Sequence, residues 1–307
     1  MGKLKNALSL YSLKVLFIFI FILLSTLTAA VQAVELDFEH LNYPNKQRQS
    51  YPILLLDLAL RASGKTYVLT PSANDYEQKR ALTDLASNKF LDVSWSMTSI
   101  DRESMLLPIR IPIFKGLIGW RIPLVNSKSS DLFLNSQSKK DIQLLKAGQM
   151  HDWPDTRILE WNGITMFRSS SYAGLFKMLA MDRIDYFPRS VIEVWREYEA
   201  NKSMQIKVDE NILIYYPTAF YYFVNKNRPE LARAIESGLE TMINDGRFDE
   251  LFMRYHKGYI EAANLDKRTL IVLKNILLPP KTPINRPELW YKPKIDPINA
   301  STDLSQD

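Results

Sequence analysis

The sequence predicts an α/β protein in which strands and helices alternate along one large domain or two modest ones. Between Val34 and Asn275, short apolar or aromatic runs alternate with longer amphipathic runs, a pattern typical of strands followed by helices. Strands that alternate with helices favour parallel sheets with covered faces. The chain has 307 residues and no cysteine, so a hydrophobic core has to stabilise it without disulfides.

The expected elements follow from these runs in chain order. Gly64 ends the first expected helix, and Asp245-Gly246 ends the last one, as glycine commonly does at a helix carboxyl end. We expect helices at 52–62, 77–86, 141–145, 172–181, 190–200 and 229–244. We expect strands at 67–70, 90–94, 116–122, 163–167, 184–187, 212–216 and 219–224.

The first 33 residues have the pattern of a secretory signal peptide. Lys3, Lys5 and Lys14 precede an apolar run at 15–24, and Val31-Gln32-Ala33 places small side chains at a cleavage site. The alternative is a retained anchor, although the apolar stretch is shorter than the roughly 20 residues of a spanning helix. Without cysteine the leader cannot be that of a lipoprotein. We therefore expect a periplasmic protein, secreted across the inner membrane.

Composition excludes several classes of function. The net charge of +5 includes the three lysines of the leader, so the mature chain is nearly neutral and gives no support for nucleic-acid binding. The three histidines, His40, His151 and His256, do not stand at metal-ligand spacing, and no hydrolase, zinc-protease or P-loop motif occurs. We expect no catalytic residues, no metal and no cofactor.

The segment 279–307 differs from the rest of the chain because it is rich in proline. Such a segment is typical of an extended strap with a polar tail. It would lie on the body of the protein or on a partner, with Trp290 as its anchor. The alternative is a simple tail that covers exposed core.

Four stretches in series resemble the type II periplasmic solute-binding proteins, in particular solute-binding protein family 3, the amino-acid-binding components of ABC transporters. The segment 91–103 resembles a strand followed by the "T-x-x-x-R" ligand loop, and 112–117 stands where the family has "P-Y" before its first crossover. The segment 181–187 resembles "G-R-I-D-x-x", and 243–251 resembles the closing helix "DG-x-F-x-x-L".

This resemblance implies a two-lobed clamshell, each lobe a mostly parallel sheet flanked by helices. Lobe 1 would comprise 34–116 plus 221–278, and lobe 2 would comprise 117–220. The chain would cross between the lobes near Gly116 and near Pro217-Thr218. The ligand would lie in the cleft between the lobes, which would close on it by a hinge motion.

In lobe 1 the resemblance places Arg102 as the clamp for a ligand carboxylate. A guanidinium matches two carboxylate oxygens and stays charged when buried. The alternative is an ordinary ion pair with Asp101 or Glu103. Ser96 and Thr98 are candidate hydrogen-bonding partners of the same ligand, or they reflect plain strand alternation.

In lobe 2 the candidates are Ser170 and Ser171, just before the helix expected to begin at Tyr172. A hydroxyl turn at a helix amino end can hold an anion or can simply cap the helix. Tyr172 is also a candidate for stacking on the ligand, as are Trp95 and Tyr51. Core packing is the alternative for each of these rings.

One departure from the family bears on the ligand. Arg189-Ser190 stands where amino-acid binders have an acidic residue that pairs with the ligand ammonium. Because a buried ammonium without a counter-charge is costly, Arg102 and Arg189 together favour an anionic ligand. The alternative is an ion pair between Arg189 and Glu193, four residues later.

The function expected from the sequence is that of a non-enzymatic periplasmic solute-binding protein. It would capture a small polar, anionic or amino-acid-like molecule for an ABC-type transporter and act as a monomer, with an inner-membrane permease as its partner. The alternative is a ligand-sensing receptor for a membrane signalling protein. An alternative of another class is a catalytically active or purely structural clamshell.

Overall fold

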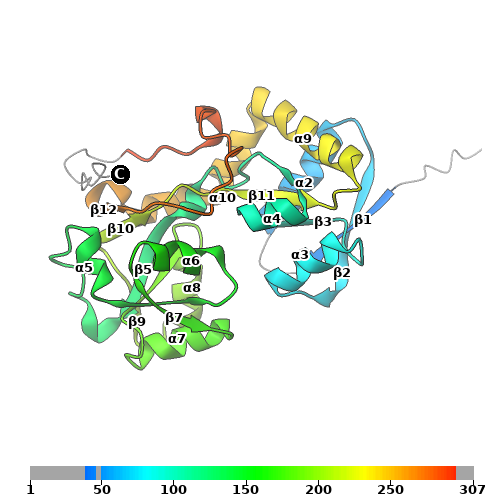
Figure 1. The fold of residues 1–307 in the computed structure, drawn as a ribbon. Coiled ribbons are helices and arrows are strands. Elements are labelled where there is room, and N and C mark those ends of the chain that lie inside the picture. Colours follow the sequence, from blue (N-terminus) through cyan, green and yellow to red (C-terminus); the bar gives the residue numbers. More distant parts are fainter. Residues whose placement is uncertain (1–38, 46–49, 295–307) are drawn as a thin grey trace, which may run out of the picture. The chain divides into compact units, whose positions relative to one another are not determined.

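The computed structural model describes residues 39–45 and 50–294 (Figure 1). The predicted signal peptide and the end of the proline-rich segment lie outside the described residues. Among the helices of the described part, none is long and apolar enough to cross a membrane.

The described strands form a large sheet and two small ones. The three-stranded sheet has the order β3 (Val93–Met97), β11 (Phe220–Val224) and β4 (Leu107–Ile109). Beside it, β1 (Glu39–Asn45) pairs with β2 (Tyr67–Asp75). The large sheet has the order β12-β10-β5-β8-β6-β7, with β9 on β5. Its strands are β5 (Trp120–Asn126), β6 (Lys146–Met150), β7 (Thr165–Ser169), β8 (Tyr186–Ser190), β9 (Ile206–Val208), β10 (Ile212–Tyr215) and β12 (Thr269–Val272).

We call the part around the three-stranded sheet lobe 1 and the part around the large sheet lobe 2. The helices of lobe 1 are α2 (Ser50–Ala62), α3 (Gln78–Ala86), α4 (Ile100–Met105), α9 (Pro229–Asn244) and α10 (Arg247–Ala263). The helices of lobe 2 are α5 (Lys139–Gln143), α6 (Pro154–Trp161), α7 (Tyr172–Ala180) and α8 (Val194–Asn201).

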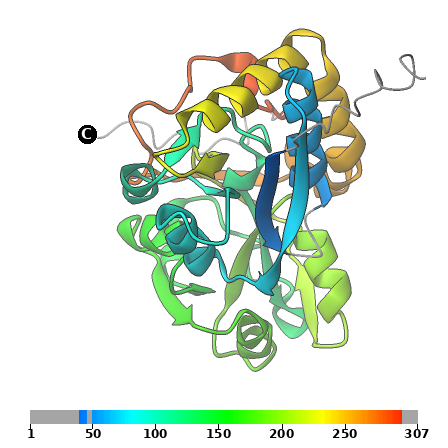
Figure 2. The same ribbon diagram turned by 90° about the vertical axis from the view of Figure 1, so that its right-hand side faces the viewer.

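Helices α2 and α9 lie side by side in lobe 1 (Figures 1 and 2). The expected helix at 229–244 is confirmed as α9, and it buries Leu231, Ile235 and Leu239 at the spacing of one helix face. Gly238 lies against the carbonyl of Ala59 on α2, where a Cβ would overlap that oxygen. The glycine therefore sets how closely the two helices approach.

The predicted α/β class is confirmed, but the expectation of mostly parallel sheets is wrong in detail. In the described part, each antiparallel pair involves either β5 or β11. The other pairs are parallel. These two strands are the ones with which the chain enters lobe 2 and returns to lobe 1, so they run against their neighbours.

The chain crosses between lobe 1 and lobe 2 at two places, which we call the first and the second crossing. The first runs through the 3-10 turn Leu117–Gly119 into β5, and the second joins β10 to β11. They pack together, since Gly119 lies on the carbonyl of Tyr216. The predicted boundary of lobe 1 needs one correction: β12 pairs with β10 and so belongs to the large sheet. A third passage of the chain, after α10, brings it there.

The proline-rich strap and Asn275, just before it, are attached to the two crossings. Asn275 donates to the carbonyl of Pro217 at 2.9 Å, and the backbone N–H of Tyr291 donates to the carbonyl of Lys115 at 2.7 Å. The indole of Trp290 lies on Gly116, where a Cβ would overlap the ring. The strap runs beside α9 in both views, and Arg286 pairs with Glu240 of that helix (Figures 1 and 2). Trp290 is thus an anchor onto the protein's own body.

Candidate functional site

The carboxyl ends of β6, β7 and β8 come together at one edge of the large sheet. β6 runs parallel to both β7 and β8, and the N–H of His151 donates to the carbonyl of Ser169 at 3.0 Å, which joins the first two ends. Helices α6 and α7 begin just beyond them. Such an edge of an open α/β sheet is a common place for a ligand.

Lobe 1 faces this edge with β3 and α4. Met97 at the end of β3 packs in one apolar cluster with Tyr216, next to the second crossing. Asp101 of α4 forms an ion pair with Arg157 of α6 at 2.7 Å. The start of α4 in lobe 1 and the start of α6 in lobe 2 are therefore neighbours.

Arg102 lies at this junction and is only 7% exposed. Its Nη1 donates to the hydroxyl of Ser96 and to the carbonyl of Met97 at 2.8 Å, and its Nη2 donates to Gln78 at 2.8 Å. None of the described carboxylates lies within ion-pair distance of it. Burial lowers its pKa to about 10, an effect that the charges of Asp155, Asp152 and Asp101 partly oppose.

The alternative for Arg102, an ion pair with Asp101 or Glu103, is not what the structure shows. Asp101 pairs with Arg157, and Glu103 pairs with Arg110 at 2.5 Å. Arg102 is therefore a buried cation held by neutral groups. This environment is costly for a charge unless an anion approaches it.

The other candidates of lobe 1 have local partners. Ser96 accepts from Arg102, and Thr98 donates to Glu103 at 2.8 Å. Trp95 is buried edge-on against Tyr222. Ser96 therefore helps to position Arg102, and Thr98 helps to position Glu103.

Tyr51 lies elsewhere, in the core of lobe 1. Its hydroxyl donates to the carbonyl of Ile113 at 2.8 Å, and its ring packs against His256 with centroids 4.6 Å apart. The structure therefore shows Tyr51 packed in the core, which was the alternative to a role in stacking on the ligand.

Arg189 has two acidic partners in lobe 2. Its Nε and Nη2 donate to both carboxylate oxygens of Glu197 at 2.6 and 2.7 Å, and Glu193 lies 3.1 Å away. Trp153 stacks on the guanidinium, with the ring centroid 4.7 Å from Cζ. Burial raises the pKa of Glu197, but the charge and hydrogen bonds of Arg189, together with the hydrogen bond from Tyr172 and the charge of Arg196, lower it overall. Arg189 is therefore not a spare cation, and the ion-pair alternative is the one found.

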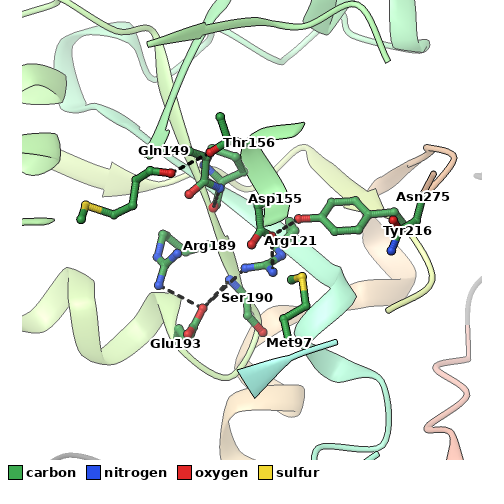
Figure 3. Close-up of polar contacts among 12 residues, drawn as sticks. Met97, Arg121, Gln149, Asp155, Thr156, Arg189, Ser190, Glu193, Tyr216 and Asn275 are labelled. Atoms are coloured by element: carbon green, nitrogen blue, oxygen red, sulfur yellow. Dashed lines mark hydrogen bonds and ion pairs between the residues drawn. The ribbon is translucent and has the colours of Figure 1, made fainter. Parts of the chain in front are cut away.

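A second ion pair lies beside the first one (Figure 3). Arg121 Nη2 lies 2.5 Å from Asp155 Oδ1, and the hydroxyl of Tyr216 donates to the same oxygen. Glu193 bridges the two pairs, 3.6 Å from Arg121. The network holds three carboxylates for two guanidiniums, so its formal charge is negative.

The serines and the tyrosine after β7 have structural partners. The hydroxyl of Ser171 accepts from the N–H of Gly174 at 3.0 Å, so Ser171 caps the amino end of α7. Capping is the alternative that the sequence offers for this serine. Ser170 and Ser171 are both exposed. Tyr172 donates to Glu197 at 2.6 Å and so joins the charge network. The structure thus groups Tyr172 with Arg189, and Arg102 with Ser96.

Sequence reasoning missed most of this lobe 2 edge. Asp152, Trp153 and Asp155 follow β6, a strand that the sequence did not predict. The signal that could have indicated them is Pro154, which stands in the first turn of α6 as proline commonly does. Within the described residues no group of acidic or histidine side chains could hold a metal ion.

A cavity of about 490 Å³ lies apart from these residues, between the strap and the two crossings. Trp120 and Tyr215 stack in its wall with centroids 4.1 Å apart, and Trp290 and Tyr291 close it from the strap. It contains none of the candidate site residues.

Comparison with known proteins shows the fold. No family model and no curated protein sequence matches the chain. An ancestral arginine-binding protein bound to arginine matches with a TM-score of 0.54 and 15% identity, over 70% of this chain and 97% of that one. A histidine kinase sensor domain with similarity to periplasmic binding proteins matches with a TM-score of 0.53 and 14% identity, over 71% and 96%.

A third solved structure has the same fold and a link to an enzyme. It is an ancestral amino-acid-binding protein, a precursor of cyclohexadienyl dehydratase, with a TM-score of 0.51 and 14% identity, over 71% of this chain and 95% of that one. The chain therefore has the two-lobed fold of the type II periplasmic binding proteins. The predicted fold class is confirmed.

Proposed function

We propose that this protein is a periplasmic solute-binding protein. It captures a small amino-acid-like molecule between its lobes and delivers it to an ABC-type transporter of the inner membrane. The observation that supports this best is Arg102, a buried guanidinium at the junction of the lobes with no carboxylate partner among the described residues.

The hydrogen bonds of Arg102 within the described residues leave two of its N–H donors unused. A guanidinium has five N–H donors, and three of them are used by Ser96, Met97 and Gln78. The remaining two are on Nε and Nη2, which share one edge of the guanidinium. Two parallel N–H groups on one edge match the two oxygens of a carboxylate. A purely anionic ligand was expected because Arg102 and Arg189 would both face it as cations. Since Arg189 is paired with Glu197, this expectation no longer applies.

A second candidate is a sensory receptor that passes its closed state to a membrane signalling protein. Two observations favour it. The strap binds the first crossing and Asn275, just before the strap, binds the second, so a partner bound to this segment would act on the hinge. One protein of the same fold is a histidine kinase sensor domain.

Thermal unfolding of the mature chain with each of the twenty L-amino acids and with simple carboxylates tests the binding function. A ligand that binds the native state raises the unfolding temperature by mass action. We expect at least one carboxylate-bearing compound to do so. A folded protein whose unfolding temperature responds to none of them contradicts the proposal. Uptake of the labelled ligand by cells without the gene separates the two candidates, since a transport component is needed for uptake and a sensor is not.

A further inference from the structure

The cavity between the strap and the two crossings has the size of a small-molecule site, at about 490 Å³. Its wall contains Trp120, the first residue of β5, and Tyr215, the last residue of β10. These two residues are partners on neighbouring strands, and their rings are stacked. They therefore present an apolar aromatic surface at the point where the chain crosses between the lobes.

The strap side of this cavity is formed by Trp290 and Tyr291. The indole of Trp290 lies on Gly116, and its Nε1 donates to the carbonyl of Pro283 at 2.9 Å. The backbone N–H of Tyr291 donates to the carbonyl of Lys115. Because both residues are held by other parts of the protein, this side of the cavity is pre-formed, as is usual for a ligand site.

The polar groups of the lining favour an anion. Among the described residues that line the cavity, Lys292 is the one charged side chain, and none is acidic. Lys292 is exposed, and no described carboxylate lies within ion-pair distance of it. The hydroxyls of Tyr215 and Tyr291 can also donate hydrogen bonds. Ile284, another lining residue, is 65% exposed, so the cavity is open to solvent there.

We propose that this cavity is a second ligand site, separate from the junction of the lobes, and that it binds a planar aromatic carboxylate. The ring of the ligand packs against the aromatic side chains of the wall, and its carboxylate faces Lys292. An aromatic amine finds no acidic partner in the described lining, and a small aliphatic carboxylate has no ring to stack. The ligand contacts the strap and the strand ends next to both crossings, so the site belongs to the hinge.

The test is fluorine NMR of the mature chain labelled with 5-fluorotryptophan, which gives one signal for each tryptophan. Variants that replace one tryptophan each by phenylalanine assign the signals. Trp120 and Trp290 report on the cavity. Trp95 of β3 and Trp153, which stacks on Arg189, report on the junction of the lobes.

Three compounds separate the effect of the ring from that of the charge: indole-3-acetate, its uncharged amide indole-3-acetamide, and acetate. Lys292→Gln removes the charge from the lining. The matched control is Lys281→Gln, at an exposed position of the strap outside the lining. Since both lysines are exposed, both variants should fold, and circular dichroism checks this.

We expect indole-3-acetate to shift the signals of Trp120 and Trp290 and to bind about fivefold more tightly than its amide, as for one exposed charge pair. Acetate should leave both signals unchanged. Lys292→Gln should lower the affinity for indole-3-acetate to that for the amide, whereas Lys281→Gln should have no effect.

Four results overturn the inference. Indole-3-acetate may leave the signals of Trp120 and Trp290 unchanged, or shift those of Trp95 and Trp153 instead. The amide may bind as tightly as indole-3-acetate, or Lys292→Gln may have no more effect than the control. Shifts of Trp120 and Trp290 that appear only in a variant ending at Lys294 also overturn it, because they assign the cavity to residues 295–307.

Discussion

Asp101 and Arg157 form an ion pair, with Oδ2 and Nη1 2.7 Å apart, that joins α4 of lobe 1 to α6 of lobe 2. Both side chains are more than half exposed, at 66% and 55%. Exposed pairs contribute little to stability, about 0–1 kcal/mol. This pair nonetheless connects the two segments that hold Arg102 and Asp152, so it bears on how the two lobes approach each other.

Arg157→Gln should therefore change the free energy of unfolding by less than about 1 kcal/mol and weaken ligand binding a few-fold. The loss should be smaller at high salt, because salt already screens an exposed pair. Calorimetric titration at low and high ionic strength measures this. Arg254→Gln is the matched control, since Arg254 pairs with Glu250 within one helix. Equal effects of the two variants on binding would contradict a role for the Asp101–Arg157 pair between the lobes.

Gly116→Ala should strongly destabilise the protein, because Trp290 of the strap occupies the space that a Cβ would need. Gly116 also has a φ of +74°. Gly64→Ala is the matched control, since its φ is +76° and nothing lies within 4 Å of the added Cβ. We expect a loss of about 1 kcal/mol for Gly64→Ala from backbone strain alone and of about 2–4 kcal/mol for Gly116→Ala.

Urea unfolding measures both glycine variants. The double variant Gly116→Ala with Trp290→Ala should be less destabilised than the sum of its single changes, because the overlap is then gone. If the losses in the free energy of unfolding are additive in the double variant, or equal at positions 64 and 116, Trp290 of the strap does not pack against Gly116 of the first crossing.

His256 should make the protein less stable in mild acid. It is packed among aromatic rings, including Tyr51 and Phe252, and burial lowers its pKa to about 4. An unfolded histidine has a pKa of about 6.5. Between this pH and about 4, the histidine is therefore protonated in the unfolded state and neutral in the folded state. The contribution of this group, about 3 kcal/mol, is present above pH about 6.5 and is lost as the pH falls towards 4.

Unfolding free energies measured across this pH range check the histidine prediction. His256→Phe should flatten the dependence by about the expected amount, whereas His40→Gln, at an exposed position, should leave it as it is. An unchanged pH profile in folded His256→Phe would assign the acid sensitivity to other groups.

Asp155→Asn should cost about 3–5 kcal/mol of stability, because it leaves the guanidinium of Arg121 buried without its nearest counter-charge. Tyr216→Phe removes one hydrogen bond to the same carboxylate and should cost about 1 kcal/mol. Asp57→Asn, in the exposed pair with Arg61, is the control. Denaturant unfolding measures all three, and similar losses for Asp155→Asn and Asp57→Asn would contradict the assignment of a buried network.

The fold was largely predictable in segments whose apolar residues recur with the period of a helix or a strand. Helix α9 was found with its bounds because its buried residues recur on one face. Strand β6 was missed, since Lys146–Met150 holds few residues that favour strands. It is a strand because it pairs with β7 and β8. Gly148 also leaves the space in which Ile184 and Leu175 pack against it, and both facts appear only in the tertiary structure.

The candidate site was predictable only in part, for a similar reason. Arg102 stands in a local motif, so the sequence singled it out. The sequence predicts the ion pair of Arg189 with Glu193, four residues later, which is present at 3.1 Å, but it does not predict the bidentate pair with Glu197, eight residues later. Tyr216 and Asp155 are 61 residues apart, and no spacing rule connects residues that meet through the fold of a whole lobe.

The most direct test of the account is a titration of the best-binding amino acid into the wild type and into Arg102→Lys. Lysine keeps the positive charge but lacks the planar fork that pairs with both carboxylate oxygens. We predict an affinity lower by about tenfold or more in the folded variant. An unchanged dissociation constant in folded Arg102→Lys would show that the ligand carboxylate is not bound by Arg102.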